Sequence, residues 1–122
     1  MIKEMHGWKV IKRSTRCSAR ARGWFNVGCD WGIRYPFGEE VKPNVKDTKL
    51  FFFKDRKDAF DFAGPTEIVV PCIAYNAVQV KWVCRYPSNA HRFWRLRSKA
   101  NKKIKYLAPE GTWVAESLIC LE

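Results

Sequence analysis

The segment from Arg85 to Lys105 combines the residue types that contact nucleic acids. It carries seven cations between residues 92 and 105, and no acidic residue occurs from 86 to 109. Cationic side chains bind phosphate oxygens, and an exposed aromatic ring stacks on an unpaired base for about 1–3 kcal/mol. We expect Trp94 to stack and the following residues to contact phosphate: Arg92, Arg95, Arg97, Lys99, Lys102, Lys103 and Lys105.

A second group of cations precedes it in the chain, at Arg16, Arg20 and Arg22. If residues 16–22 are extended, these side chains share one face, while Cys17, Ala19 and Ala21 form a small-residue face that packs inward. A rigid strand would hold the guanidinium groups in register for bidentate phosphate contacts. The same pattern also fits an edge strand that charge protects against aggregation, just as segment 85–105 also fits a solvated face.

Catalytic chemistry has little support. The two histidines are His6, which we expect in a loose N-terminus, and His91, which lies among cations and suits phosphate contact better than base catalysis. No nucleotide-loop, hydrolase or zinc-protease motif is present. A small nucleotide-acting enzyme would rest only on the loop carboxylates of Asp30, Glu39 and Glu40. We therefore predict no catalytic residue, no cofactor and no metal.

The cysteines indicate a reducing, cytoplasmic compartment. They are odd in number and contain no close C-x-x-C pair, so neither a disulfide framework nor a four-cysteine zinc site is expected. The N-terminus lacks the apolar core of a signal peptide, and no window is long and apolar enough to span a bilayer. The five are Cys17, Cys29, Cys72, Cys84 and Cys120.

Length and charge set the class of protein. The chain has 122 residues and a formal net charge of +11, which suits one globular domain with the electrostatic character of a nucleic-acid-binding protein. Residues 1–35 and 69–122 each carry +6, whereas residues 36–68 carry −1. Two basic ends therefore flank a nearly neutral middle.

Hydrophobic periodicity predicts the elements that position these groups. A continuous apolar run at Leu50–Phe53 indicates a buried central strand, and Asp55–Ala63 reads as a helix that Asp55 caps and Gly64-Pro65 ends. A turn is expected at Tyr75-Asn76. The remaining predicted strands are Trp8–Arg13, Arg16–Arg22, Glu67–Ile73, Ala77–Arg85 and Thr112–Leu121.

The basic segment has two interpretations. Apolar residues at helical steps from Phe93 to Leu107 favour a helix that ends at Pro109. Repulsion among its uncompensated cations also suits a mobile arm between two strands, and the helix is slightly favoured. We predict one α+β domain over residues 1–122, with an antiparallel-rich sheet of about five to six strands and one short packed helix. A basic helix or arm at 86–108 is inserted before the last strand.

The order of these features resembles that of small accessory proteins encoded by phages and other viruses of microbes. The resemblance covers most of the chain outside 86–108 and transfers no site residue. It implies a compact α+β domain with a role in infection, such as inhibition of a host defence in the manner of an anti-CRISPR. It is carried by Gly7–Ile11, Tyr35, Gly38, Pro43, Leu50–Phe53, Ala59, Phe62-Ala63, Val69–Cys72, Pro109–Thr112 and Leu118–Leu121.

These observations predict a non-catalytic protein that binds RNA, DNA or a ribonucleoprotein in the host cytoplasm, with no membrane partner. The alternative is a protein–protein inhibitor of a host defence complex, whose basic surface occupies an acidic or nucleic-acid-binding channel. A nucleotide-acting enzyme ranks third.

Overall fold

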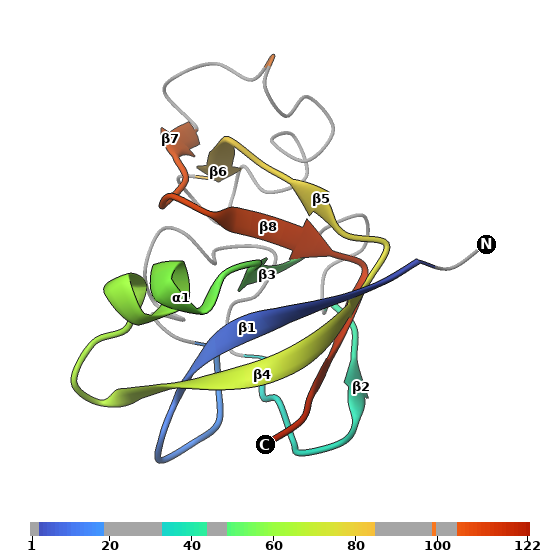
Figure 1. Cartoon of the computed structure of the whole chain (residues 1–122), viewed down its shortest axis with the longest axis vertical. Coiled ribbons are helices and arrows are strands. Elements are labelled where there is room, and N and C mark those ends of the chain that lie inside the picture. Colours follow the sequence, from blue (N-terminus) through green and yellow to red (C-terminus); the bar gives the residue numbers. More distant parts are fainter. Residues whose placement is uncertain (1–2, 19–32, 44–48, 85–98, 100–104) are drawn as a thin grey trace.

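The computed structural model describes residues 3–18, 33–43, 49–84, 99 and 105–122. Within them lie nine strands and the helix α1, Arg56–Phe62 (Figure 1). The strands are β1 Glu4–Lys12, β2 Glu40–Val41, β3 Leu50–Phe53, β4 Glu67–Tyr75, β5 Val78–Gln79, β6 Trp82–Cys84, β7 Lys105–Leu107, β8 Thr112–Ala115 and β9 Ser117–Cys120.

Seven strands form one antiparallel sheet that closes into a barrel. Their order is β2-β9-β4-β1-β3-β8-β5. Only Glu116 separates β8 from β9 in the chain, yet β4, β1 and β3 lie between them in the sheet. The sheet must therefore curl until the end of β8 meets the start of β9 at Glu116. The short strands β2 and β5 lie at the two edges of the sheet.

The C-terminal half of the barrel is one long, bent hairpin. In β4 and β9, Tyr75 pairs with Ser117, and in β5 and β8, Val78 pairs with Val114 in the same continuous register. Beyond β5 and β8 the hairpin continues into the separate β6–β7 ladder, where Cys84 pairs with Lys105 (Figure 1). The whole basic segment between them is therefore the connection at the end of this hairpin.

The barrel interior is apolar and contains one buried lysine. Its core includes Tyr35, Leu50 and Phe52. Lys9 is only 3% exposed, and its Nζ donates a hydrogen bond to the Phe51 carbonyl oxygen at 2.7 Å. The same ammonium lies 4.8 Å from the centre of the Tyr35 ring. These two contacts compensate part of the cost of burying the charge.

Helix α1 covers part of the outer face of the sheet. Ala59 is fully buried and forms a second apolar cluster with Val10 and Phe53, against which Phe62 packs. The Phe53 and Phe62 ring centres are 5.3 Å apart. The predicted boundaries are confirmed, because Asp55 is the N-cap residue and Ala63 is the extended C-cap residue. Capping by the Asp55 side chain was wrong, since that side chain makes no capping hydrogen bond.

Two predicted strands are each divided. The described part of the predicted strand Ala77–Arg85 forms β5 and β6 in different sheets, and the last strand is split at Glu116 into β8 and β9. The predicted turn at Tyr75-Asn76 is instead a bend, with Asn76 at a φ of 53° and the strand continuing beside the same partner. Hydrophobic periodicity does not detect a bend after which the strand stays paired with the same partner. The predicted number of five to six strands was therefore too low.

Two further predictions were wrong. His6 is not in a loose N-terminus but lies in β1, paired with Ile73. The proposed helical stripe does not extend through residues 105–107, which form β7, and Leu107 is 60% exposed. In the described residues there is no second α-helix.

Candidate functional site

Part of the outer sheet face is not covered by α1. Alternate residues of a strand share a face, so Tyr75 points to the same side as Val69, which packs under the helix. Tyr75 lies directly opposite Glu4 on one side and Ser117 on the other. The open half of the outer face, defined by these residues and by Glu40 on the neighbouring β2, is the candidate site.

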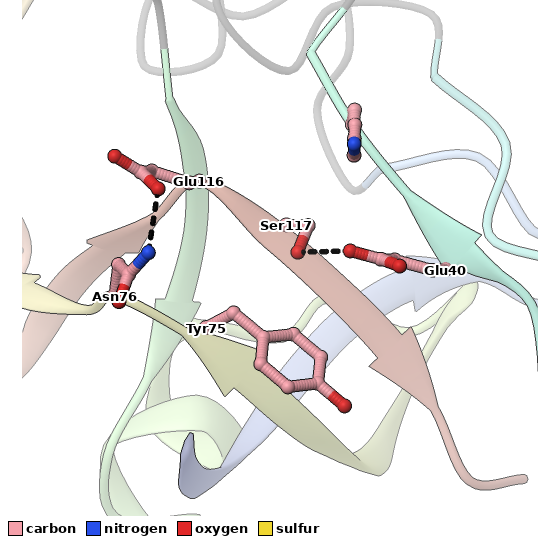
Figure 2. Close-up of a pocket in the computed structure, with 6 residues that line it drawn as sticks. Glu40, Tyr75, Asn76, Glu116 and Ser117 are labelled. Carbon is pink, nitrogen blue, oxygen red and sulfur yellow. Dashed lines mark hydrogen bonds between the residues drawn. The ribbon is translucent and has the colours of Figure 1, made fainter. Parts of the chain in front are cut away.

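A pocket of about 470 Å³ lies on this open half. Figure 2 shows side chains from three adjacent strands at the pocket, with Glu40 from β2, Ser117 from β9 and Tyr75 from β4. The buried Ser117 hydroxyl donates a hydrogen bond to Glu40 Oε2 at 2.7 Å. The described residues that line it are Glu40, Lys42, Tyr75, Asn76, Glu116 and Ser117.

The bend of the long hairpin forms one wall of the pocket. The Asn76 side-chain amide donates to Glu116 Oε2 at 2.7 Å, and its Oδ1 accepts from the Lys3 backbone N–H at 3.1 Å. Lys49 approaches Glu116 Oε1 at 3.5 Å. The hydrogen bond from Asn76, followed by the charge of Lys49, lowers the pKa of the Glu116 carboxyl from its ordinary value. Glu116 therefore stays ionised and holds the bend.

Three groups in the pocket are not occupied by these contacts. Glu40 Oε1, Lys42 Nζ and the Tyr75 hydroxyl form no hydrogen bond to any residue in the described part of the chain. Glu40 and Lys42 are exposed and Tyr75 is half-buried. The pocket thus offers an anionic acceptor, a cation and an aromatic ring to a ligand.

Of the cations Arg16, Arg20 and Arg22, the structure describes Arg16. It is half-buried in a turn, at a φ of 60°, and not in a strand. Its Nε donates to the Tyr35 carbonyl oxygen at 2.9 Å, and its Nη2 donates to the Glu122 carbonyl oxygen. The predicted faces were also wrong at the two following residues: Ser18, expected on the same face as Arg16, is 1% exposed, whereas Cys17, expected to pack inward, is half-buried. Arg16 therefore ties the turn to the C-terminus.

The basic segment is described only in small part. Lys99 is exposed, and Lys105 begins β7. The structure does not bring Arg16, Lys99 and the pocket into one site. The remaining predicted contact residues lie outside the described residues: Arg20, Arg22, Arg92, Trp94, Arg95, Arg97, Lys102 and Lys103.

The sequence reasoning missed most of the pocket. Glu40 was noticed as a loop carboxylate, and it lies in β2, but Lys42, Tyr75 and Ser117 were not singled out. One available signal was Tyr75 at the outward-facing end of an apolar strand. Nothing local in the sequence indicates that β2 lies beside the end of the last strand.

Neither a protein-family model, a curated protein nor a solved structure matches this chain. Among the described residues, no group of three or more potential ligands could hold a metal ion, and Cys17, Cys72 and Cys120 form no disulfide bond there. No helix in that same part of the chain is long and apolar enough to cross a membrane. The candidate site therefore has to be interpreted from its own chemistry.

Proposed function

We propose that this protein is a non-catalytic accessory protein that binds RNA, DNA or a ribonucleoprotein through its basic hairpin end. One observation carries the proposal. The pairing of Cys84 with Lys105 makes the acid-free basic segment the connection at the end of a hairpin that extends beyond the barrel. Cations concentrated at one end of a domain attract phosphate backbones.

The overall charge supports the same interpretation. A net charge of +11 in 122 residues favours a polyanionic partner. In the described core, Lys9 is buried and Arg16 is bonded internally, so neither contributes a simple solvent-facing cation. The resemblance to phage-encoded accessory proteins suggests that the partner is met in the host cytoplasm during infection.

The test is a titration of labelled single-stranded RNA, single-stranded DNA and duplex DNA, followed by fluorescence anisotropy at several salt concentrations. We expect the logarithm of the binding constant to fall linearly with the logarithm of salt concentration. Combined substitution R95A, R97A and K99A removes three cations, so the slope for a single strand should decrease by about 2.

A matched control removes three cations elsewhere. Lys54, Arg56 and Lys57 are exposed residues at and before α1, so K54A, R56A and K57A change the net charge by the same amount. An equal loss of slope in both variants would contradict a role specific to the hairpin. No binding at low salt would contradict the proposal and favour the protein–protein inhibitor.

A further inference from the structure

The pocket on the open half has a composition that restricts its ligand. A ring stacks best on an aromatic face, so the half-buried Tyr75 favours a flat ligand. Glu40 Oε1 is an acceptor without a hydrogen-bond partner among the described residues, and Lys42 supplies a positive charge at the same pocket. A nucleotide has all three complementary parts, namely a flat base, N–H donors and a phosphate.

The carboxylate selects among the bases. An ionised carboxylate only accepts hydrogen bonds, and it pairs best with two parallel donors. Each carboxylate oxygen has two lone pairs, so Glu40 Oε2 can accept a second hydrogen bond beside the one from Ser117. Guanine presents two adjacent donors, N1–H and the 2-amino group, on its Watson–Crick edge. Adenine, cytosine and uracil present donors next to acceptors there, so an acceptor of the base would face a carboxylate oxygen. Glu40 therefore favours guanine.

A metal ion fits the same pocket less well. Glu116 already accepts from Asn76 at 2.7 Å and lies 3.5 Å from Lys49. Glu40 accepts from Ser117, and the Lys42 ammonium at the same pocket repels a cation. These contacts favour a neutral base with an attached phosphate over a divalent cation.

We propose that this pocket binds a single guanine base of a nucleic acid strand, with Tyr75 stacking on the base, Glu40 accepting from its Watson–Crick edge and Lys42 contacting a phosphate. This inference rests on the proposed function, because the pocket lies at the bend of the hairpin that carries the basic segment. Residues 77–84 separate the pocket from the basic segment, and at about 3.3 Å per residue they span at most about 26 Å. One strand of a few nucleotides can therefore reach both.

The first experiment compares a short oligouridine with the same oligomer carrying one central guanosine. We expect the guanosine to strengthen binding roughly tenfold, within the range of one stacked and hydrogen-bonded base. The variants Y75L and E40Q should each remove most of this gain. Glu39 is the exposed neighbouring carboxylate and does not line the pocket, so E39Q is the matched control and should keep the gain.

The second experiment uses mononucleotides and does not require the basic segment to bind. In ¹⁵N-resolved NMR spectra of the full chain, guanosine monophosphate should shift the amide signals of Tyr75, Ser117 and Glu40. Adenosine monophosphate should shift them much less at the same concentration, and K42A should weaken the response to guanosine monophosphate.

The outcomes separate the two proposals. If oligouridine binds with a salt dependence but guanosine adds nothing, the guanine pocket is wrong and the proposed function stands. If guanosine monophosphate shifts the pocket signals while no oligomer binds, guanine recognition stands for a mononucleotide only, and the proposed function fails. Broadening of the Glu40 and Glu116 signals by Mn²⁺, with no response to guanosine monophosphate, would overturn the guanine proposal in favour of a cation site.

Discussion

The two halves of the outer sheet face are built from the same strands but differ in what covers them. Over Val10 and Val69, helix α1 closes the face with Ala59 and Phe62, and the cluster is apolar. Over the other end of β1 and β4, no described element covers Tyr75, and the neighbouring side chains of Glu40, Lys42 and Ser117 are polar. We call these the covered half and the open half.

The comparison teaches that strand periodicity assigns a residue to a face but does not determine its environment. Val69 and Tyr75 both point outward from β4, yet one packs against a helical cluster and the other lines a pocket. Burial supplies stability on the covered half, whereas the open half keeps groups available for a ligand. Substitutions should therefore affect stability on the first and binding on the second.

The largest effect is expected at Phe53 on the covered half. F53A removes a ring that is 6% exposed and packs on Phe62, so the free energy of unfolding should fall by about 3–5 kcal/mol. Urea denaturation followed by tryptophan fluorescence measures it. Phe60 lies on α1 but is 49% exposed, so F60A should lower the free energy of unfolding by about 1 kcal/mol or less. Equal losses in the two variants would show that the exposed Phe60 stabilises the fold as much as the buried Phe53 does.

Two glycines allow a similar comparison, because Gly111 lies against α1 whereas Gly38 lies in open space. Gly111 has a φ of 79°, and an added Cβ would overlap the Asp58 carboxylate, with its Cγ at 2.6 Å. G111A should therefore destabilise by about 2–4 kcal/mol, from the backbone conformation and from the clash. Gly38 has a φ of 75° with nothing within 4 Å, so G38A should cost only about 1–2 kcal/mol. Adding D58A to G111A removes the carboxylate but leaves the Cβ of residue 58 at 2.9 Å, so part of the difference should be recovered. No recovery would show that the Asp58 carboxylate does not press on this turn.

The thiol of Cys72 tests whether water is excluded from the barrel interior, which lies beneath both halves of the outer face. Burial, followed by the neighbouring Cys120, raises the pKa of Cys72 from 9.0 to about 12. The thiol ionises earlier in the unfolded chain, so its contribution to stability is complete below pH 9 and is lost as pH rises toward 12. The loss amounts to about 1.4 kcal/mol per pH unit. Urea denaturation from pH 8 to 11 should show a shallower pH dependence for C72A than for the wild type; identical slopes would contradict a buried neutral thiol.

The smallest effect on stability is expected in the open half. Because Tyr75 and Glu40 are not part of either apolar cluster, Y75L and E40Q should change the free energy of unfolding by about 0.5 kcal/mol or less. Thermal unfolding followed by circular dichroism measures this. A loss comparable with that of F53A would show that these residues stabilise the barrel and would weaken the assignment of a binding pocket.

Local patterns predicted the elements whose structure depends on near neighbours. The run Leu50–Phe53 is a buried inner strand, and the helix ends where Gly64-Pro65 prevents its continuation. Lys9 shows the limit of such patterns. A lysine in a strand is ordinarily expected to face solvent, but the Phe51 carbonyl oxygen and the Tyr35 ring, both distant in sequence, accommodate it inside the barrel.

The candidate site was less predictable than the fold. Glu40 could be noticed as a carboxylate near a glycine, but its partner Ser117 is 77 residues away. The bend at Asn76 and Glu116 depends on Lys3 and Lys49, which no window along the chain places together. Periodicity reports which side of a strand a residue occupies, and it contains no information about which strand lies alongside.

The sequence by itself determined the charge of +11, the acid-free basic segment, the short helix and the buried strand at 50–53, because composition and local propensity act over a few residues. Only the tertiary structure decided that the sheet curls so that β8 and β9 meet at Glu116, that the basic segment connects the end of a bent hairpin, and that Glu40, Tyr75 and Ser117 share a pocket. Those features require pairing between distant strands, and pairing is selected by the packing of the whole barrel.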